Sequence, residues 1–158
     1  MFLKKAILSL AAFTAIFAAV PVMAESCYIN IKFESDEYNQ ITKGKDGFIF
    51  KRDYNEFCGK LKKANARLHF RSSIAVLDNR SIASVHINIV DNNLPIETGE
   101  FSGISTRLGH TSSMTEAYAI GWQSLNDAID EIKIDEAIDS LNKARAKIRA
   151  SISKSTNK

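Results

Sequence analysis

The amino-acid sequence predicts an α+β domain. We expect a small antiparallel sheet of three to four strands, packed against one N-terminal helix and one long or two shorter C-terminal helices. Apolar and polar residues alternate, as in half-buried strands, over residues 27–33, 68–90 and 101–108. Apolar residues recur at helical spacing over residues 54–61 and 114–152. Strands grouped between helices, instead of alternating with them, are typical of the α+β class.

The first 24 residues have the three parts of a secretory signal peptide. Lys4 and Lys5 precede an uncharged run over residues 6–20, and Val22-Met23-Ala24 offers short side chains where a signal peptidase reads them. That run is shorter than the roughly 20 residues needed to span a bilayer, which disfavours an uncleaved membrane anchor. The Ala-rich leader is typical of a bacterial signal peptide. We therefore expect cleavage after Ala24 and export to the periplasm or the extracellular space.

Residues 25–152 are expected to form one domain and residues 153–158 a short flexible basic tail. Without Lys4 and Lys5, 19 of the 21 basic residues face 18 acidic ones, a net charge of +1. A net charge this close to zero argues against nonspecific electrostatic binding to nucleic acid. The local exception is residues 143–158, a segment that contains six Lys and Arg residues and no Asp or Glu. This stretch is either a polybasic surface or a solvated helix end.

Cys27 and Cys58 are the two cysteines of the chain, and in an exported protein such a pair is expected to oxidise. Cys27 lies on the apolar side of the first predicted strand. Cys58 lies on the apolar side of the helix that begins after Asp53, which with Glu56 forms a capping box. We predict a structural disulfide that joins the two elements. A redox pair would have closer spacing, and a lipid on Cys27 is disfavoured by the preceding Glu25 and Ser26.

Residues 68–77 and 82–90 read as a β-hairpin with one apolar and one polar face, and residues 101–108 as a weaker third strand. A short run at residues 48–50 is a candidate edge strand. With the hairpin turn placed at Asn79-Arg80, His86 faces Ser73 and His69 faces Val90. In that register the two histidines are not neighbours, and we expect no metal site.

The C-terminal region carries two apolar stripes, which differ in direction around the helix axis. The first runs over residues 118–132 and the second over residues 134–152. A break near residues 133–135 would let both stripes meet one core. A continuous helix would leave the second stripe exposed as a surface for another exported protein or for a second copy of the chain.

His110, Thr111, Ser112 and Ser113 form the stretch best suited to hold a ligand, because backbone N–H groups and the helix dipole at a helix start favour an anion. Plain helix capping explains the same hydroxyls. The chain contains no Gly-x-Ser-x-Gly, no phosphate loop and no dinucleotide fingerprint, so no cofactor is expected. The acidic residues between 127 and 139 are interpreted as a solvated helix face.

The sequence therefore favours a small exported binding protein without catalysis. An inhibitor or immunity-type protein and an envelope accessory protein both fit, with the C-terminal helical face as the surface for another exported protein. One alternative is an enzyme whose dispersed site lies near His110. Another is a carrier of small ligands lined by Phe70, Tyr118 and Trp122.

Overall fold

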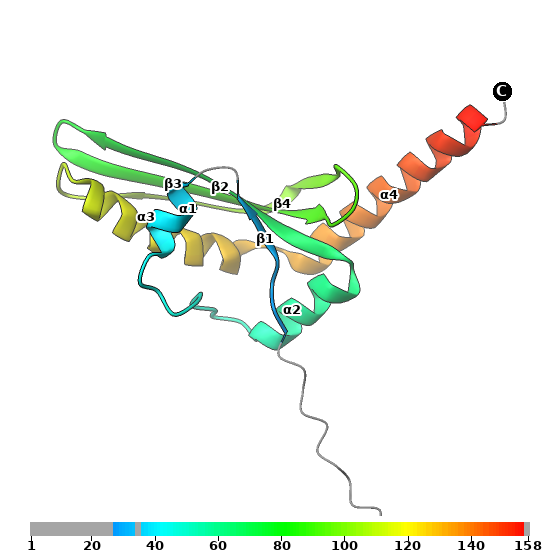
Figure 1. The fold of residues 1–158 in the computed structure, drawn as a ribbon, viewed down its shortest axis with the longest axis horizontal. Coiled ribbons are helices and arrows are strands. Elements are labelled where there is room, and N and C mark those ends of the chain that lie inside the picture. The colour runs from blue at the N-terminus through cyan, green and yellow to red at the C-terminus, as the bar shows by residue number, and fades with distance from the viewer. Residues whose placement is uncertain (1–26, 34–35, 157–158) are drawn as a thin grey trace, which may run out of the picture.

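The computed structural model describes residues 27–33 and 36–156, and the α+β class is confirmed (Figure 1). The predicted signal peptide lies outside the described residues. The elements in chain order are β1 (Ile31–Phe33), α1 (Glu37–Thr42), α2 (Tyr54–Lys63), β2 (Ala66–Leu77), β3 (Arg80–Asp91), β4 (Glu97–Leu108), α3 (Met114–Glu131) and α4 (Ile134–Thr156). The strands form one sheet in the order β1-β2-β3-β4. None of the described helices is long and apolar enough to cross a membrane.

The sheet is mixed and not wholly antiparallel as predicted, because β1 pairs with β2 in parallel. The chain leaves β1, passes through α1 and α2, and enters β2 in the same direction, and a parallel pair requires a crossover of this kind. β1 is also shorter than the predicted strand over residues 27–33. The short helix α1 was not predicted. It places Tyr38 between the rings of Phe33, at a centroid distance of 4.9 Å, and Phe70, at 5.2 Å.

β2 and β3 form the predicted hairpin, but its turn is Asp78-Asn79, one position before the predicted one. Leu77 therefore pairs with Arg80, and every partner on β3 shifts by two residues. Because side chains alternate with a period of two, this shift leaves the same residues on each face. The register places His69 opposite Asn88 and His86 opposite Arg71.

The helices pack against one face of the sheet, with α2 and α3 below it in Figure 1. The core between these layers contains Phe57, Leu68, Phe70, Val85, Ile87, Ile89, Leu125, Ile129 and Leu141, all of them buried. The predicted edge strand at residues 48–50 is wrong. In place of strand pairing, Phe48 stacks on Trp122 with the ring centroids 6.0 Å apart, and the Ile49 N–H donates to Asn126 Oδ1.

Two C-terminal helices are present, with the break at the predicted place. Ile132 caps α3 with an extended backbone, φ −60° and ψ 123°. Arg52 stabilises this break, because its guanidinium donates to the carbonyl oxygens of Asp130 and Ile132, which the helix end leaves without helical partners.

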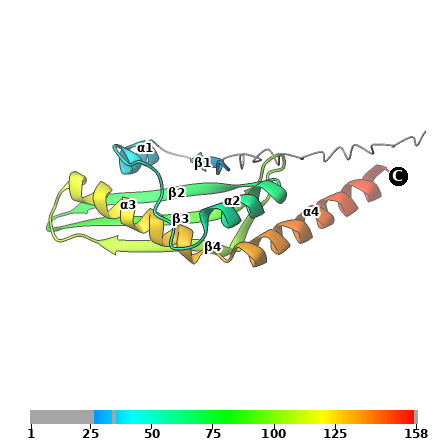
Figure 2. The same cartoon turned by 90° about the horizontal axis from the view of Figure 1, so that it is seen from below.

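α4 packs on the sheet through its first turns and then continues past the sheet as a projecting arm (Figures 1 and 2). Ile134, Ala137 and Leu141 are buried, whereas Ile152 is 59% exposed. The second apolar stripe is thus buried in its first half, partly buried at Ile148 and exposed at Ile152. α4 extends to Thr156, which includes the first four residues of the tail predicted over residues 153–158.

Candidate functional site: a basic cavity beside α4

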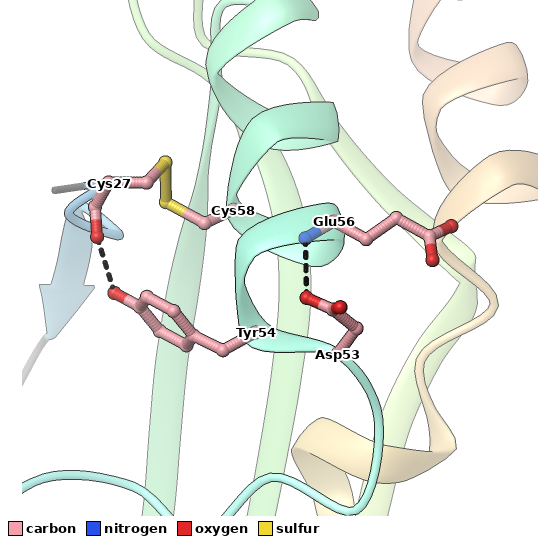
Figure 3. The surroundings of a disulfide bond; sticks show 5 residues. All are labelled: Cys27, Asp53, Tyr54, Glu56 and Cys58. Carbon is pink, nitrogen blue, oxygen red and sulfur yellow. Dashed lines mark hydrogen bonds between the residues drawn. A yellow bond between two sulfur atoms is a disulfide. The ribbon is translucent and has the colours of Figure 1, made fainter. Parts of the chain in front are cut away.

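The disulfide between Cys27 and Cys58 is present and joins the segment that leads into β1 to helix α2 (Figure 3). The Cα atoms are 6.0 Å apart. Tyr54 adds a second tie, since its hydroxyl donates to the Cys27 carbonyl oxygen at 2.9 Å. The predicted capping box also forms, with the Glu56 N–H donating to Asp53 Oδ1 at 3.0 Å. This region is structural: it fixes β1, a strand of three residues, to the domain.

The stretch His110 to Ser113 lies before α3, and its polar groups are engaged within the chain. The backbone N–H groups of His110 and Thr111 donate to the Glu116 carboxylate, at 3.0 and 2.7 Å. The Ser112 hydroxyl donates to the Leu77 carbonyl oxygen at 2.7 Å, and Ser113 caps α3 by accepting from the Glu116 N–H. The Glu116 carboxylate thus occupies the N–H groups that a bound anion would use.

The hydrogen bonds to Glu116 predict that its contribution to the stability of the fold is lost in acid. The Thr111 hydroxyl, followed by the N–H groups of His110 and Thr111, lowers the pKa of Glu116 to about 2, from 4.5. A carboxyl whose pKa is lowered on folding stabilises the fold above its unfolded pKa, and this contribution disappears as the pH falls toward its folded pKa. We expect the Glu116→Gln variant to be less stable than the natural chain at pH 6, and the difference to shrink between pH 4.5 and about pH 2.

Urea unfolding of both proteins at several pH values measures this difference. Asp91 and Glu97 also have lowered pKa values, but they titrate in both proteins and cancel in the comparison. A constant gap between the two midpoints across this pH range would contradict the role assigned to Glu116.

A cavity of about 610 Å³ lies at the end of the sheet beside α4. Three segments meet there: the end of α2, the turn between β3 and β4, and the middle of α4. The lining residues are Lys63, Ala64, Asn65, Asp91, Asn93, Leu94, Asn142, Arg145, Ala146 and Arg149. Three cations and three amides therefore surround a space of the size that binds ligands or side chains of a partner.

A buried ion pair connects α4 to the sheet at this cavity. Arg145 Nε donates to Asp91 Oδ2 at 2.5 Å, and a second guanidinium N–H reaches the Asn65 carbonyl oxygen at 3.1 Å. The other Asp91 oxygen accepts from the N–H groups of Asn93 and Leu94. Burial raises the pKa of Asp91, but these hydrogen bonds and the Arg145 charge outweigh it, and the pKa lies below its ordinary value. Arg145 and the turn are thereby fixed in position.

Lys63 and Arg149 line the same cavity from two different helices, α2 and α4. Neither has a carboxylate partner within the part of the chain that the structure describes. Asp91 is the one acidic residue in the lining, and Arg145 already neutralises it. The cavity therefore carries an excess of positive charge, which suits a carboxylate or another anionic group.

The sequence contained one signal for this site, the basic run after residue 142, where four of the six cations lie at 143–149. Sequence reasoning missed the contributions of Lys63, Asn65 and Asn93, which come from segments distant in the chain. The three aromatic residues suggested to line a space for a small ligand lie in or against the packed core. Phe70 and Trp122 belong to the packed core, with Tyr118 against it.

Residues 27–33 and 36–156 contain no group of three or more His, Cys, Asp or Glu residues placed to hold a metal ion. Comparison of the chain with protein-family models, with curated protein sequences and with solved structures finds no match.

Proposed function

We propose that this chain is an exported, non-catalytic binding protein that holds an acidic segment of a partner protein in the basic cavity beside α4. The observation that carries this proposal is the pair of cations, Lys63 and Arg149, which line the cavity and have no carboxylate partner among the described residues. An inhibitor, an immunity-type protein and an envelope accessory protein would all act through such a surface.

Charge complementarity supports a partner with carboxylates. After Asp139, α4 carries Lys143, Arg145, Lys147, Arg149 and Lys154 and no acidic residue. Lys143 is paired with Asp139 at 2.8 Å and Arg145 with Asp91, which leaves the outer part of the arm positive. Complementary charge speeds the encounter of two proteins and selects the right partner more than it increases affinity.

The shape of α4 supports a protein partner more than a small molecule. The arm extends past the sheet, and no described element covers its last turns (Figure 2). Ile152 on the arm is 59% exposed and Leu94 at the cavity is 39% exposed. Apolar side chains that a partner could contact therefore lie close to the cations. Apolar contacts surrounded by polar groups are typical of protein interfaces.

The contacts of the residues around His110 support the non-catalytic reading, because the polar groups beside it are engaged within the chain. Ser112 and Ser113 bind backbone groups, and His110 lies exposed on a turn whose N–H is held by Glu116. The disulfide suits export, since such bonds persist in oxidising compartments.

Charge reversal at the cavity tests the proposal. We expect the Lys63→Glu/Arg149→Glu double variant to bind a fluorescein-labelled ten-residue glutamate peptide at least about tenfold more weakly than the natural chain, by fluorescence anisotropy. The matched control is Lys43→Glu/Arg80→Glu, which makes the same change in net charge at exposed positions away from the cavity. Equal loss in both double variants, or none in either, would refute the assigned site.

A further inference from the structure

The face of the sheet opposite the helices carries a second, smaller pocket. The register places Lys32 of β1 beside His69 of β2, and Arg67 lies two residues before His69 on the same face. The pocket measures about 180 Å³, and its polar lining residues are Lys32, Arg67, His69, Arg71, Asp91 and Glu97. It goes beyond the proposed function, because none of the cations of the α4 cavity contributes to it.

The carboxylates of this pocket are already neutralised. Glu97 binds Arg71 at 3.0 Å, accepts a hydrogen bond from Asn88, and lies 3.6 Å from His69 Nδ1. Burial raises the pKa of Glu97, but these partners outweigh it and lower the pKa, so the group is ionised and compensated. Asp91 is paired with Arg145. The charges of Lys32 and Arg67 therefore remain without compensation among the described residues.

Arg67 has a further property that indicates a ligand. Its Nε atom is buried and has no hydrogen-bond partner within residues 27–33 and 36–156. Its register partner on β3 is Val90, which offers no acceptor side chain. Buried donors in folded proteins are nearly always hydrogen-bonded, and a guanidinium donor most of all, so an acceptor is expected at this position.

The arrangement of donors selects the class of anion. The Nε–H of Arg67 and a neighbouring terminal N–H form a planar fork that binds two oxygens of an anion, while the Lys32 ammonium is a point charge on the adjacent strand. A carboxylate has two oxygens, and the fork uses both. A phosphoryl or sulfuryl group has a third oxygen for the ammonium. The volume is below that of pockets that enclose drug-sized molecules, so a single such group fits.

We propose that Arg67 and Lys32 form a binding site for one tetrahedral oxyanion group, a phosphate or a sulfate, on the face of the sheet that the helices leave open. The group is either a free ion or the end of a larger molecule. His69, Arg71 and Glu97 line the same pocket beside them.

Titration of the ¹⁵N-labelled full chain with sodium phosphate, followed by NMR, tests this site. Sodium sulfate and sodium acetate are the comparison titrants, with ionic strength held constant by sodium chloride. We expect a saturating shift of the Arg67 Nε–Hε signal with phosphate or sulfate, and the tighter of the two identifies the source. No saturating shift with either ion, or an equal shift with acetate, would overturn the proposal.

The Arg67→Gln variant provides a second measurement, with Arg80→Gln as the matched control at the exposed first residue of β3. Backbone signals of residues 67–71 should no longer respond to phosphate in Arg67→Gln and should respond normally in Arg80→Gln. An unchanged response in Arg67→Gln would overturn the proposal. If Arg67→Gln does not fold, the Arg67 side-chain signal of the natural chain decides alone. Lys63→Glu/Arg149→Glu should retain the phosphate response, which separates this site from the α4 cavity.

Discussion

Replacement of Gly103 by alanine is expected to unfold the domain or to lower its free energy of unfolding by at least about 4 kcal/mol. Gly103 lies in β4, where the backbone of α3 packs directly against the strand. A Cβ atom at this position would lie 1.6 Å from the Ala128 carbonyl oxygen and 3.1 Å from an Ile132 side-chain atom. The first contact is to helix backbone, so α3 itself must move away from the sheet, and the core beneath it opens.

Gly99 is the matched control for this prediction. It lies in the same strand, and a Cβ atom there would meet nothing within 4 Å. The free energy of unfolding of the Gly99→Ala variant should therefore lie within about 1 kcal/mol of that of the natural chain. Urea unfolding followed by circular dichroism measures both. Equal stability of the two variants would mean that α3 does not approach β4 as described.

Removal of the disulfide by the Cys27→Ser/Cys58→Ser double variant is expected to cost roughly 3.5 to 4 kcal/mol of unfolding free energy. The bridge closes a segment with a sequence separation of 31, and cross-linking a loop of that length restricts the unfolded chain. It also fixes β1, which pairs with β2 through three residues only. Strand pairs this short are marginal without further support.

A variant in the same region separates the contribution of the disulfide to stability from that of the neighbouring hydrogen bond. The Tyr54→Phe variant loses the hydrogen bond to the Cys27 carbonyl oxygen and keeps the disulfide, so we expect a loss of about 1 kcal/mol. Urea midpoints of the oxidised natural chain, the same chain with dithiothreitol, and both variants provide the measurement. A double-serine variant as stable as the oxidised natural chain would show that the bridge contributes nothing to folding.

The parts of the fold predicted correctly are those with local signals. Alternation defined the hairpin faces, capping residues defined the starts of α2 and α3, and the change of stripe direction defined the break before α4. The break itself is stabilised by Arg52, which lies 78 and 80 positions from its two carbonyl partners. No periodic pattern carries that information, so the sequence could indicate the break but not its cause.

The candidate sites depend even more on contacts between distant segments. Asp91 and Arg145 are separated by 54 positions, and each is an ordinary charged residue in its own segment. Likewise, a hairpin turn one position earlier than predicted places His69 beside Asn88 and not Val90. His69 and Asn88 are each 3% exposed although they lie on the open face of the sheet. Composition and spacing do not reveal such burial.

Site-specific photo-crosslinking in the producing cells is the most direct test of binding at the α4 cavity. A benzoylphenylalanine at Ala146, an exposed position in the cavity lining, should crosslink to one protein, identified by mass spectrometry, through a segment rich in Asp or Glu. The adduct should disappear with Lys63→Glu/Arg149→Glu and should not form from the same probe at Lys43. No adduct from position 146, or the same adduct from both positions, would contradict the binding function proposed for this chain.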